Sequence, residues 1–367
     1  MKFNITKSSF HEVLGYVKGI IPVTASTPMM QNFYLSANES GLKVIGTDSE
    51  NTIKIDFDAD IISNGEIVLP FKFLNETISN IPNDYILEFE LKNDFMVVKT
   101  TDTKFKFVFA NASDYPKPPE YNETMSFEIS TEILSKMIKK TIFAVSTDKT
   151  NRIHLSGLNF KIMQNMLHIA GTDVRRLAYI KQNIDCKSEF SFTVPFETLK
   201  EVKTLCDKHN SVKIVLTEKK NQIIFDFGKI IYYSRLLEEE FPDYLSIIPS
   251  GAISSINIST DIFKQTLKMA RPIANASSIK SVRFRLEDKQ LILEADAEEQ
   301  GQFSTSLKVD SQGDNADINF NIDYFYQVAE ICETKNILID LNGPTRPSVV
   351  REQDNTDFVY IVMPLRG

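Results

Sequence analysis

Apolar and polar positions alternate over a few residues and then change to helical spacing at three places along the chain. The stretches are MKFNITKSSF from residue 1, MSFEISTEIL from residue 125 and SSINISTDIF from residue 254. Alternation is typical of a short strand, and each stretch then reaches a hydroxyl residue, Thr6, Ser130 or Ser259. Because such a residue is a good helix N-cap, the pattern predicts three strands that each lead directly into a helix.

A second pattern recurs deeper in each copy. LPFKFLNETI from residue 69, VPFETLKEV from residue 194 and FNIDYFYQV from residue 320 each predict a helix after a β-type run. The triplet Gly-Thr-Asp occurs in the same register at 46–48 and 171–173, and Asp296 takes the place of Asp48 and Asp173 in the third copy. Motifs in one order that repeat about every 125 residues predict three homologous domains, over 1–120, 125–249 and 254–367.

The segments between the predicted helices favour an α+β fold. They are alternating, β-branched runs such as SVKIVLTEKKNQIIFDF (211–227), separated by turn signals. Each domain therefore reads as two helices packed on about eight short antiparallel strands. The junctions near 116–121 and 249–254 are short and marked by Pro or Gly, so we expect the domains to be docked rigidly.

Composition excludes several classes of protein. The chain has 367 residues and a net charge of −8, and no apolar run is long enough to span a membrane. The three cysteines have no CxxC spacing, and the N-terminus lacks a secretory signal, so a reduced, cytoplasmic protein is expected. The four histidines are scattered, so we expect no metal and no cofactor.

Basic residues recur on the outer faces of the helices that open the copies. Lys136, Lys139 and Lys140 are expected outside in the second copy, and the third exposes Lys264, Lys268 and Arg271 at spacings of four and three. For one helix, lysines that merely solvate a face are the ordinary explanation. Because basic faces recur in the copies, contacts with nucleic-acid phosphates that do not depend on the base sequence are favoured. Against this, Asp323, Glu330 and Glu333 make the second helix of the third copy acidic.

Three further motifs, together with the repeat, resemble one known family. They are GTDVRRLA (171–178), EEEFPDY (238–244) and YIVMPLR (360–366). The chain resembles the β subunit of bacterial DNA polymerase III, the sliding clamp, over its whole length. The resemblance implies a head-to-tail homodimer in which six similar domains form a ring, with helices around a central hole and sheets outside. Duplex DNA would pass through the hole irrespective of its sequence.

The resemblance also implies partners and a place in the cell. A clamp tethers the polymerase III alpha subunit, the clamp-loader complex and other proteins that carry a clamp-binding peptide, and it catalyses nothing itself. It is a bacterial cytoplasmic protein, associated with the nucleoid, without a membrane partner. The peptide has five or six residues, with Gln at its start and Leu or Phe at its end.

In the family, a groove between the second and third domains receives this peptide. Leu, Ile, Pro and flexible Met would make an adaptable apolar pocket, with arginine at its rim. By themselves, two arginines before an apolar strand are more often a solvated edge, and only the FPDY motif and the C-terminal strand favour a groove. The implied wall is Leu155, Thr172, Val174, Arg175, Arg176, Leu177, Pro242, Ile247, Asn321, Tyr324, Ile361, Val362, Met363, Pro364, Leu365 and Arg366.

The chain departs from the family at a few of these places. Val174 replaces the usual glycine, Ser246 replaces a basic residue after FPDY, and Thr24 replaces a basic residue near the hole of the first domain. The preferred peptide is therefore expected to differ. The Gly-Thr-Asp copy in the first domain lacks the RRL segment and predicts a structural turn in which Asp48 accepts hydrogen bonds from the backbone.

Two more surfaces are implied. The strand 104–109 exposes Phe105 and Phe107 on one face, and Arg271-Pro272-Ile273 ends the third opening helix. The implied dimer interface contains Lys104, Phe105, Phe107, Pro272 and Ile273. The implied DNA-facing residues are Lys136, Lys139, Lys149, Arg152, Lys264, Lys268 and Arg271.

Two other classes of protein fit less well. In an enzyme, Asp48, Asp173 and Asp296 would have to share a cation, yet each lies in a different domain, and the chain has no P-loop, GxSxG or HExxH motif. A carbohydrate-binding β-rich repeat protein would need exposed aromatic platforms. The chain has no Trp, and most Phe occupy alternating core positions.

Overall fold

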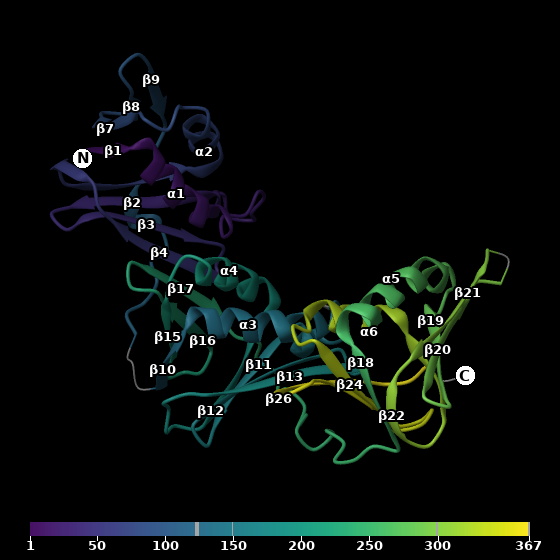
Figure 1. The fold of residues 1–367 in the computed structure, drawn as a ribbon. Coiled ribbons are helices and arrows are strands. Elements are labelled where there is room, and N and C mark those ends of the chain that lie inside the picture. Colours follow the sequence, from purple (N-terminus) through teal and green to yellow (C-terminus); the bar gives the residue numbers. More distant parts are fainter. Residues whose placement is uncertain (122–124, 149, 299, 366–367) are drawn as a thin grey trace. The chain divides into compact units, whose positions relative to one another are not determined.

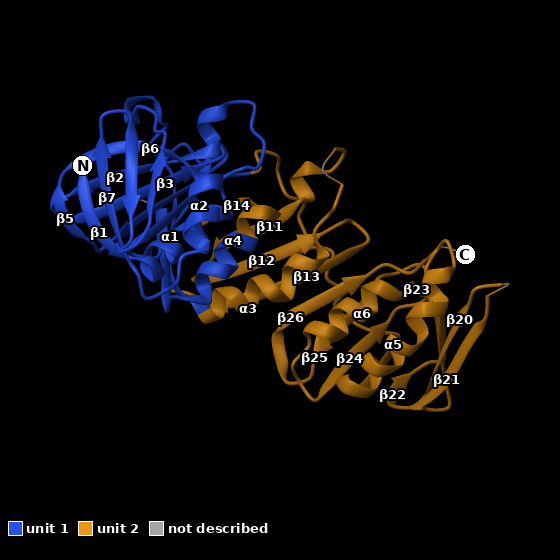
Figure 2. Cartoon of the chain, turned by 90° about the horizontal axis from the view of Figure 1, so that it is seen from above, with its two compact units in different colours: residues 1–131, 200–236 blue, residues 132–199, 237–367 orange. Residues whose placement is uncertain are grey.

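The computed structural model describes residues 1–121, 125–148, 150–298 and 300–365 (Figure 1). The chain forms two compact units (Figure 2). Unit 1 contains Met1–Thr131 and Lys200–Leu236, and unit 2 contains Glu132–Leu199 and Leu237–Gly367. No helix among the described residues is long and apolar enough to cross a membrane.

Unit 1 contains a five-stranded sheet, in the order β5-β1-β7-β8-β9, and an eight-stranded sheet, in the order β10-β15-β16-β17-β4-β3-β2-β6. Its helices are α1 (Lys7–Lys18), α2 (Phe71–Ser79) and the short η1 (Pro28–Gln31) and η2 (Ala112–Asp114). Its strands are β1 (Lys2–Thr6), β2 (Asn32–Asn38), β3 (Gly41–Thr47), β4 (Asn51–Phe57), β5 (Asp60–Ser63), β6 (Gly65–Pro70), β7 (Ile86–Lys92), β8 (Phe95–Lys99), β9 (Lys104–Phe107), β10 (Met125–Ser130), β15 (Ser211–Leu216), β16 (Gln222–Asp226) and β17 (Ile230–Arg235).

Unit 2 contains a nine-stranded sheet, in the order β14-β11-β12-β13-β26-β25-β24-β18-β22, and a four-stranded sheet, in the order β21-β20-β19-β23. Its helices are α5 (Thr260–Ala276), α6 (Ile322–Ile331), η3 (Ile142–Ala144) and η4 (Ile153–Leu155), and α3 (Thr131–Thr141) and α4 (Phe196–Cys206) cross the border between the units. Its strands are β11 (Gly157–Met163), β12 (Met166–Thr172), β13 (Arg176–Asn183), β14 (Phe190–Pro195), β18 (Ser254–Ser259), β19 (Ser281–Glu287), β20 (Gln290–Asp296), β21 (Gln302–Lys308), β22 (Asp310–Gly313), β23 (Ala316–Asn321), β24 (Asn336–Leu341), β25 (Ser348–Glu352) and β26 (Asn355–Val362).

The border between the units does not follow the predicted domain borders. Strands of the predicted middle domain join both units, because β17 pairs with β4 in unit 1 while β13 pairs with β26 in unit 2. The eight-stranded and nine-stranded sheets therefore each run from one predicted domain into the next. The division into three domains stays a prediction that rests on the sequence repeat.

The predicted strand-to-helix transitions are confirmed at β1–α1, β10–α3 and β18–α5. In the first, the Thr6 side chain accepts a hydrogen bond from the Ser9 backbone N–H at 3.3 Å, as an N-cap does. In the third, Phe263 of α5 packs edge-on against Phe284 and Phe325, with ring centroids 6.0 and 6.1 Å away.

The predicted end of the third opening helix is wrong. The triplet Arg271-Pro272-Ile273 was expected to end it, but α5 continues to Ala276 with Pro272 inside. A proline in a helix interior removes one backbone hydrogen bond, and packing can offset that loss. Here the buried side chains of Leu267, Ala270 and Ala274 continue the inner face of the helix past the proline.

Candidate partner-binding and DNA-facing sites

A tight turn joins β12 to β13 and carries the TDVRR motif. The Asp173 carboxylate accepts hydrogen bonds from the backbone N–H groups of Arg175 and Arg176, at 2.9 and 3.0 Å. The Thr172 hydroxyl donates to the Arg176 carbonyl at 2.6 Å. Val174 has a φ of 69°, a conformation that costs an L-residue about 1–2 kcal/mol and suits the glycine it replaces. Its side chain is 54% exposed.

Arg176 connects this turn to distant parts of unit 2. Its Nε donates to Asp173 Oδ2 at 3.1 Å, its Nη2 donates to the Phe143 carbonyl at 2.7 Å, and its Nη1 donates to the Gln327 side chain. The guanidinium also lies over the Tyr324 ring, 4.4 Å from its centroid. The side chain is only 9% exposed. This geometry therefore supports a role for Arg176 in holding the shape of the turn.

The C-terminal strand lies directly beside the turn. β26 pairs antiparallel with β13, with Arg176 opposite Val362 and Leu177 opposite Ile361. Beyond the strand, the Met363 N–H donates to the Arg175 carbonyl at 2.8 Å. The Leu365 N–H donates to the Asn319 carbonyl at 2.8 Å, so the chain continues from the turn to β23. Arg366 lies outside the described residues.

The FPDY segment packs against the same strands. Tyr244 belongs to a buried cluster with Leu177, Tyr179 and Ile361. The Tyr179 and Tyr244 rings are 5.7 Å apart, and Phe241 packs against the cluster. Burial raises the pKa of Tyr179 to about 12, so its hydroxyl stays protonated at neutral pH.

The apolar residues of the predicted groove fall into two sets. Leu155, Leu177, Ile361 and Val362 are buried, so they support the site from below. Pro242, Ile247 and Met363 are exposed together with Val174. Thr172 is buried, Arg175 is exposed, and Tyr324, Pro364 and Leu365 are partly buried. Asn321 caps α6, because its side chain accepts a hydrogen bond from the Asp323 N–H at 2.9 Å.

The sequence did not indicate several residues that contact the turn. Phe143 and Gln327 hold Arg176 from 33 and 151 residues away. Arg152, expected at DNA, donates to the Asp173 carbonyl at 3.1 Å and so lies at the turn.

The basic residues of α3 and α5 are largely ion-paired. Lys139 is 3.0 Å and Lys136 is 3.8 Å from Glu333, which follows α6. Lys264 is 3.1 Å from Glu330. Arg271 is 2.8 Å from Asp323. Among the described residues, Lys268 is exposed and has no carboxylate within 4 Å, and Lys149 lies outside them.

Lys140 corrects the expected pattern on α3. It was expected outside, but its side chain and that of Glu352 are each 1% exposed and form an ion pair. Burial alone would raise the pKa of Glu352, but hydrogen bonds from Lys140 and the Glu333 N–H hold that pKa below its usual value. A buried charge requires such a partner, and the helical period of α3 does not reveal one on β25.

Comparison with known proteins decides the family. The model of the DNA polymerase III beta subunit N-terminal domain matches residues 1–119, that of the central domain matches 128–243, and that of the C-terminal domain matches 245–366. The chain belongs to the DNA polymerase III beta subunit family. It is a DNA sliding clamp of replication, and clamps of this family are processivity factors and not catalysts.

Relatives match the clamp over its whole length. The beta sliding clamp of Bacillus subtilis is 28% identical over 380 residues, with all of both chains covered. That of Pseudomonas putida is 24% identical with the same coverage. The crystal structure of the Bacillus subtilis clamp has a TM-score of 0.95 at 26% identity, covering 100% of this chain and 99% of that one. A Pseudomonas aeruginosa clamp bound to griselimycin has a TM-score of 0.94 at 25% identity, with both chains fully covered.

The implied dimer edge of the clamp in unit 1 is β9, the last strand of its sheet. Lys104 is exposed and Phe105 is partly buried. Phe107 was expected to be exposed, but it is only 8% exposed, and its ring centroid lies 6.5 Å from that of Phe105. The physical reason is that β9 pairs with β8, so Phe107 lies opposite buried Met96 and packs into its own unit.

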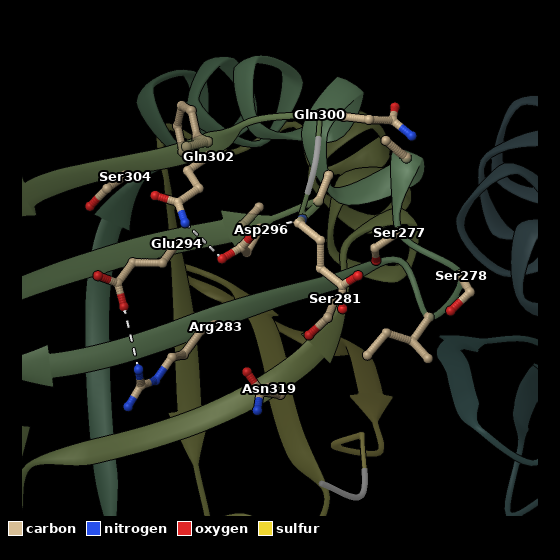
Figure 3. A pocket seen from close by; sticks show the side chains of 16 residues that line it. Ser277, Ser278, Ser281, Arg283, Glu294, Asp296, Gln300, Gln302, Ser304 and Asn319 are labelled. Atoms are coloured by element: carbon tan, nitrogen blue, oxygen red, sulfur yellow. Dashed lines mark hydrogen bonds and ion pairs between the residues drawn. The ribbon is translucent and has the colours of Figure 1, made fainter.

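The other implied edge lies in unit 2, where β21 is the last strand of the four-stranded sheet. Pro272 is exposed and Ile273 is partly buried on the nearby end of α5. An open hollow of about 840 Å³ lies between this helix end and the sheet (Figure 3). Ile279 is exposed at its border, and the Gln302 side chain donates to Asp296 at 2.9 Å within it. Among the described residues, no cluster of His, Cys, Asp or Glu could hold a metal ion.

Proposed function

We propose that two copies of this clamp, each made of three homologous domains, close head to tail into a ring around duplex DNA. The exposed edges β9 and β21 support the proposal, because an unpaired strand can extend the sheet of a second copy. Their charges are complementary: Lys104 and Lys106 lie on β9, and Asp296 and Glu298 lie beside β21. A head-to-tail contact avoids an open filament when its rotation closes after two copies.

The ring can be tested by retention on circular DNA. The clamp, loaded on a nicked circular plasmid, should stay bound and should be lost once the plasmid is linearised. Phe105→Ala with Ile273→Ala should give a folded monomer in sedimentation, because both side chains are partly exposed at the implied edges. A wild-type protein that sediments as a monomer at micromolar concentration would remove the ring from this proposal.

We further propose that the 172–177 turn and the segment after β26 bind a short peptide from the polymerase III alpha subunit, the clamp loader and other partners. One observation carries this proposal: Arg176 fixes the turn beside β26, and exposed Val174 of the turn lies near exposed Met363, whose N–H bonds Arg175. Exposed Ile247 lies between Leu245 and Ile248, which pack on the cluster of Leu177. Apolar peptide residues would contact these side chains while Leu177 and Val362 support them. A short peptide should bind with micromolar affinity, about −8 kcal/mol.

Deletion of Met363–Gly367 tests the peptide site. It removes the exposed Met363 side chain and the N–H that bonds Arg175. The anisotropy of a labelled clamp-binding peptide should therefore no longer rise when the clamp is added, and polymerase stimulation should disappear. The truncated clamp should still sediment as a dimer. Unchanged peptide affinity in a folded, dimeric truncation would contradict the proposal.

A further inference from the structure

The acidic face of α6 lies along the basic face of α5. Lys264, Lys268 and Arg271 recur at spacings of four and three, so they share one face of α5. On α6, Asp323 and Glu330 share one face in the same way. Lys264 pairs with Glu330 and Arg271 pairs with Asp323, so the two helices run side by side in opposite directions (Figure 1).

The same carboxylate segment also reaches α3. Glu333, just beyond α6, lies 3.0 Å from Lys139 and 3.8 Å from Lys136. The hydrogen bond from Lys139 keeps the pKa of Glu333 below its usual value, so this carboxylate is ionised at neutral pH. Three carboxylates from one short segment therefore pair with four cations of α3 and α5, and Asp323 also pairs with Lys280 at 3.1 Å.

We propose that these carboxylates compete with DNA phosphates for the cations of α3 and α5 and so keep the clamp's hold on duplex DNA weak. The inference rests on the proposed function, in which these helices face DNA. A phosphate that approaches Lys264 or Lys139 must displace or share a carboxylate that is already at contact distance. Weak, exchangeable contacts suit a ring that has to move along DNA.

The competition predicts that the three cations of α5 contribute unequally to DNA binding, which their equal charge alone does not. Lys268 is exposed without a carboxylate within 4 Å among the described residues, so it should contribute more to DNA binding than Lys264 or Arg271. Arg271 is held most firmly, because two of its nitrogens donate to Asp323 at 3.0 and 2.8 Å and its guanidinium lies 4.2 Å from the Tyr326 ring centroid.

The test measures anisotropy of a short fluorescein-labelled linear duplex over a series of salt concentrations. Glu330→Gln and Glu333→Gln should each tighten binding about two- to fivefold, the range expected when an exposed ion pair is removed. Each cation that gains a phosphate should steepen the log–log salt slope by about 0.9. The matched control is Asp357→Asn, which makes the same change in net charge on β26, where Asp357 lies 3.9 Å from Lys181.

A double-mutant cycle separates competition from a general charge effect. In a Lys264→Ala background the gain from Glu330→Gln should disappear, because the cation that it would free is gone. The inference is overturned if Glu330→Gln and Glu333→Gln tighten binding no more than Asp357→Asn, or if the gain survives in Lys264→Ala. Failure of this inference can be distinguished from failure of the proposed function. If α5 faces DNA, Lys268→Ala should weaken DNA binding whether or not the carboxylates compete. If Lys268→Ala has no effect, α5 does not face DNA and both fall together.

Discussion

The Gly-Thr-Asp turns of the first and second repeats share their backbone hydrogen bonds but differ in the residues that their side chains contact. In the first, Asp48 Oδ1 accepts the N–H groups of Glu50 and Asn51 at 2.9 and 2.6 Å, as predicted from the sequence. In the second, Asp173 Oδ1 accepts the two equivalent N–H groups at 2.9 and 3.0 Å. The residue after each Asp has a positive φ, 82° at Ser49 and 69° at Val174.

The turns differ in the side chain that follows. Asn51 Nδ2 donates to the second oxygen of Asp48 at 3.1 Å, and Arg176 Nε donates to the second oxygen of Asp173 at the same distance. The guanidinium has further donors, and they reach Phe143 and Gln327. The repeat thus supplies a stable turn, and one longer side chain converts it into a connection between strands and helices of unit 2.

The largest effect should come from removing that connection. Arg176→Ala removes a nearly buried guanidinium from partly buried Asp173 and Gln327 and should destabilise the protein by about 3 kcal/mol. Asn51→Ala removes a bond within the turn and should cost about 1 kcal/mol. Urea unfolding followed by circular dichroism measures both. Equal losses would show that the long-range contacts of Arg176 contribute nothing.

A smaller difference is expected between the two aspartates. Asp48→Ala and Asp173→Ala each remove two backbone hydrogen bonds to a carboxylate, at about 1.5–3 kcal/mol in total after relaxation. Asp173→Ala should cost about 1 kcal/mol more, because it also removes the partner of Arg176 Nε. The same unfolding experiment applies, and a larger loss for Asp48→Ala would reverse the comparison.

The smallest effect concerns the strained position in each turn. Val174→Gly should stabilise the protein by about 0.5 kcal/mol, since relief of about 1–2 kcal/mol of strain is partly offset by the greater freedom of glycine when unfolded. Ser49→Gly should gain less, because serine is not β-branched. Thermal unfolding compares the two variants. A loss of stability in Val174→Gly would mean that its exposed side chain makes contacts that outweigh the strain.

Sequence periodicity predicted the elements well and their long-range partners poorly. The helices α2, α4 and α6 begin where the second recurring pattern placed them, and the turn of Asp48 has the predicted bonds. Lys140 was misplaced because a helical period shows which face a residue occupies and not which distant group meets it, here Glu352. For the same reason the sequence indicated Arg176 but neither Phe143 nor Gln327. The family resemblance implied where the peptide binds without indicating what fixes the turn.

Peptide binding by matched variants of the two turns tests the central claim most directly. A labelled peptide with Gln at its start and Leu or Phe at its end would be titrated with Asn51→Ala and Arg176→Ala clamps, under conditions where sedimentation shows both as folded dimers. The account predicts wild-type affinity for Asn51→Ala and at least a tenfold loss, about 1.4 kcal/mol, for Arg176→Ala. Equal affinity of the two variants would contradict the claim that Arg176 converts the second turn into the partner site.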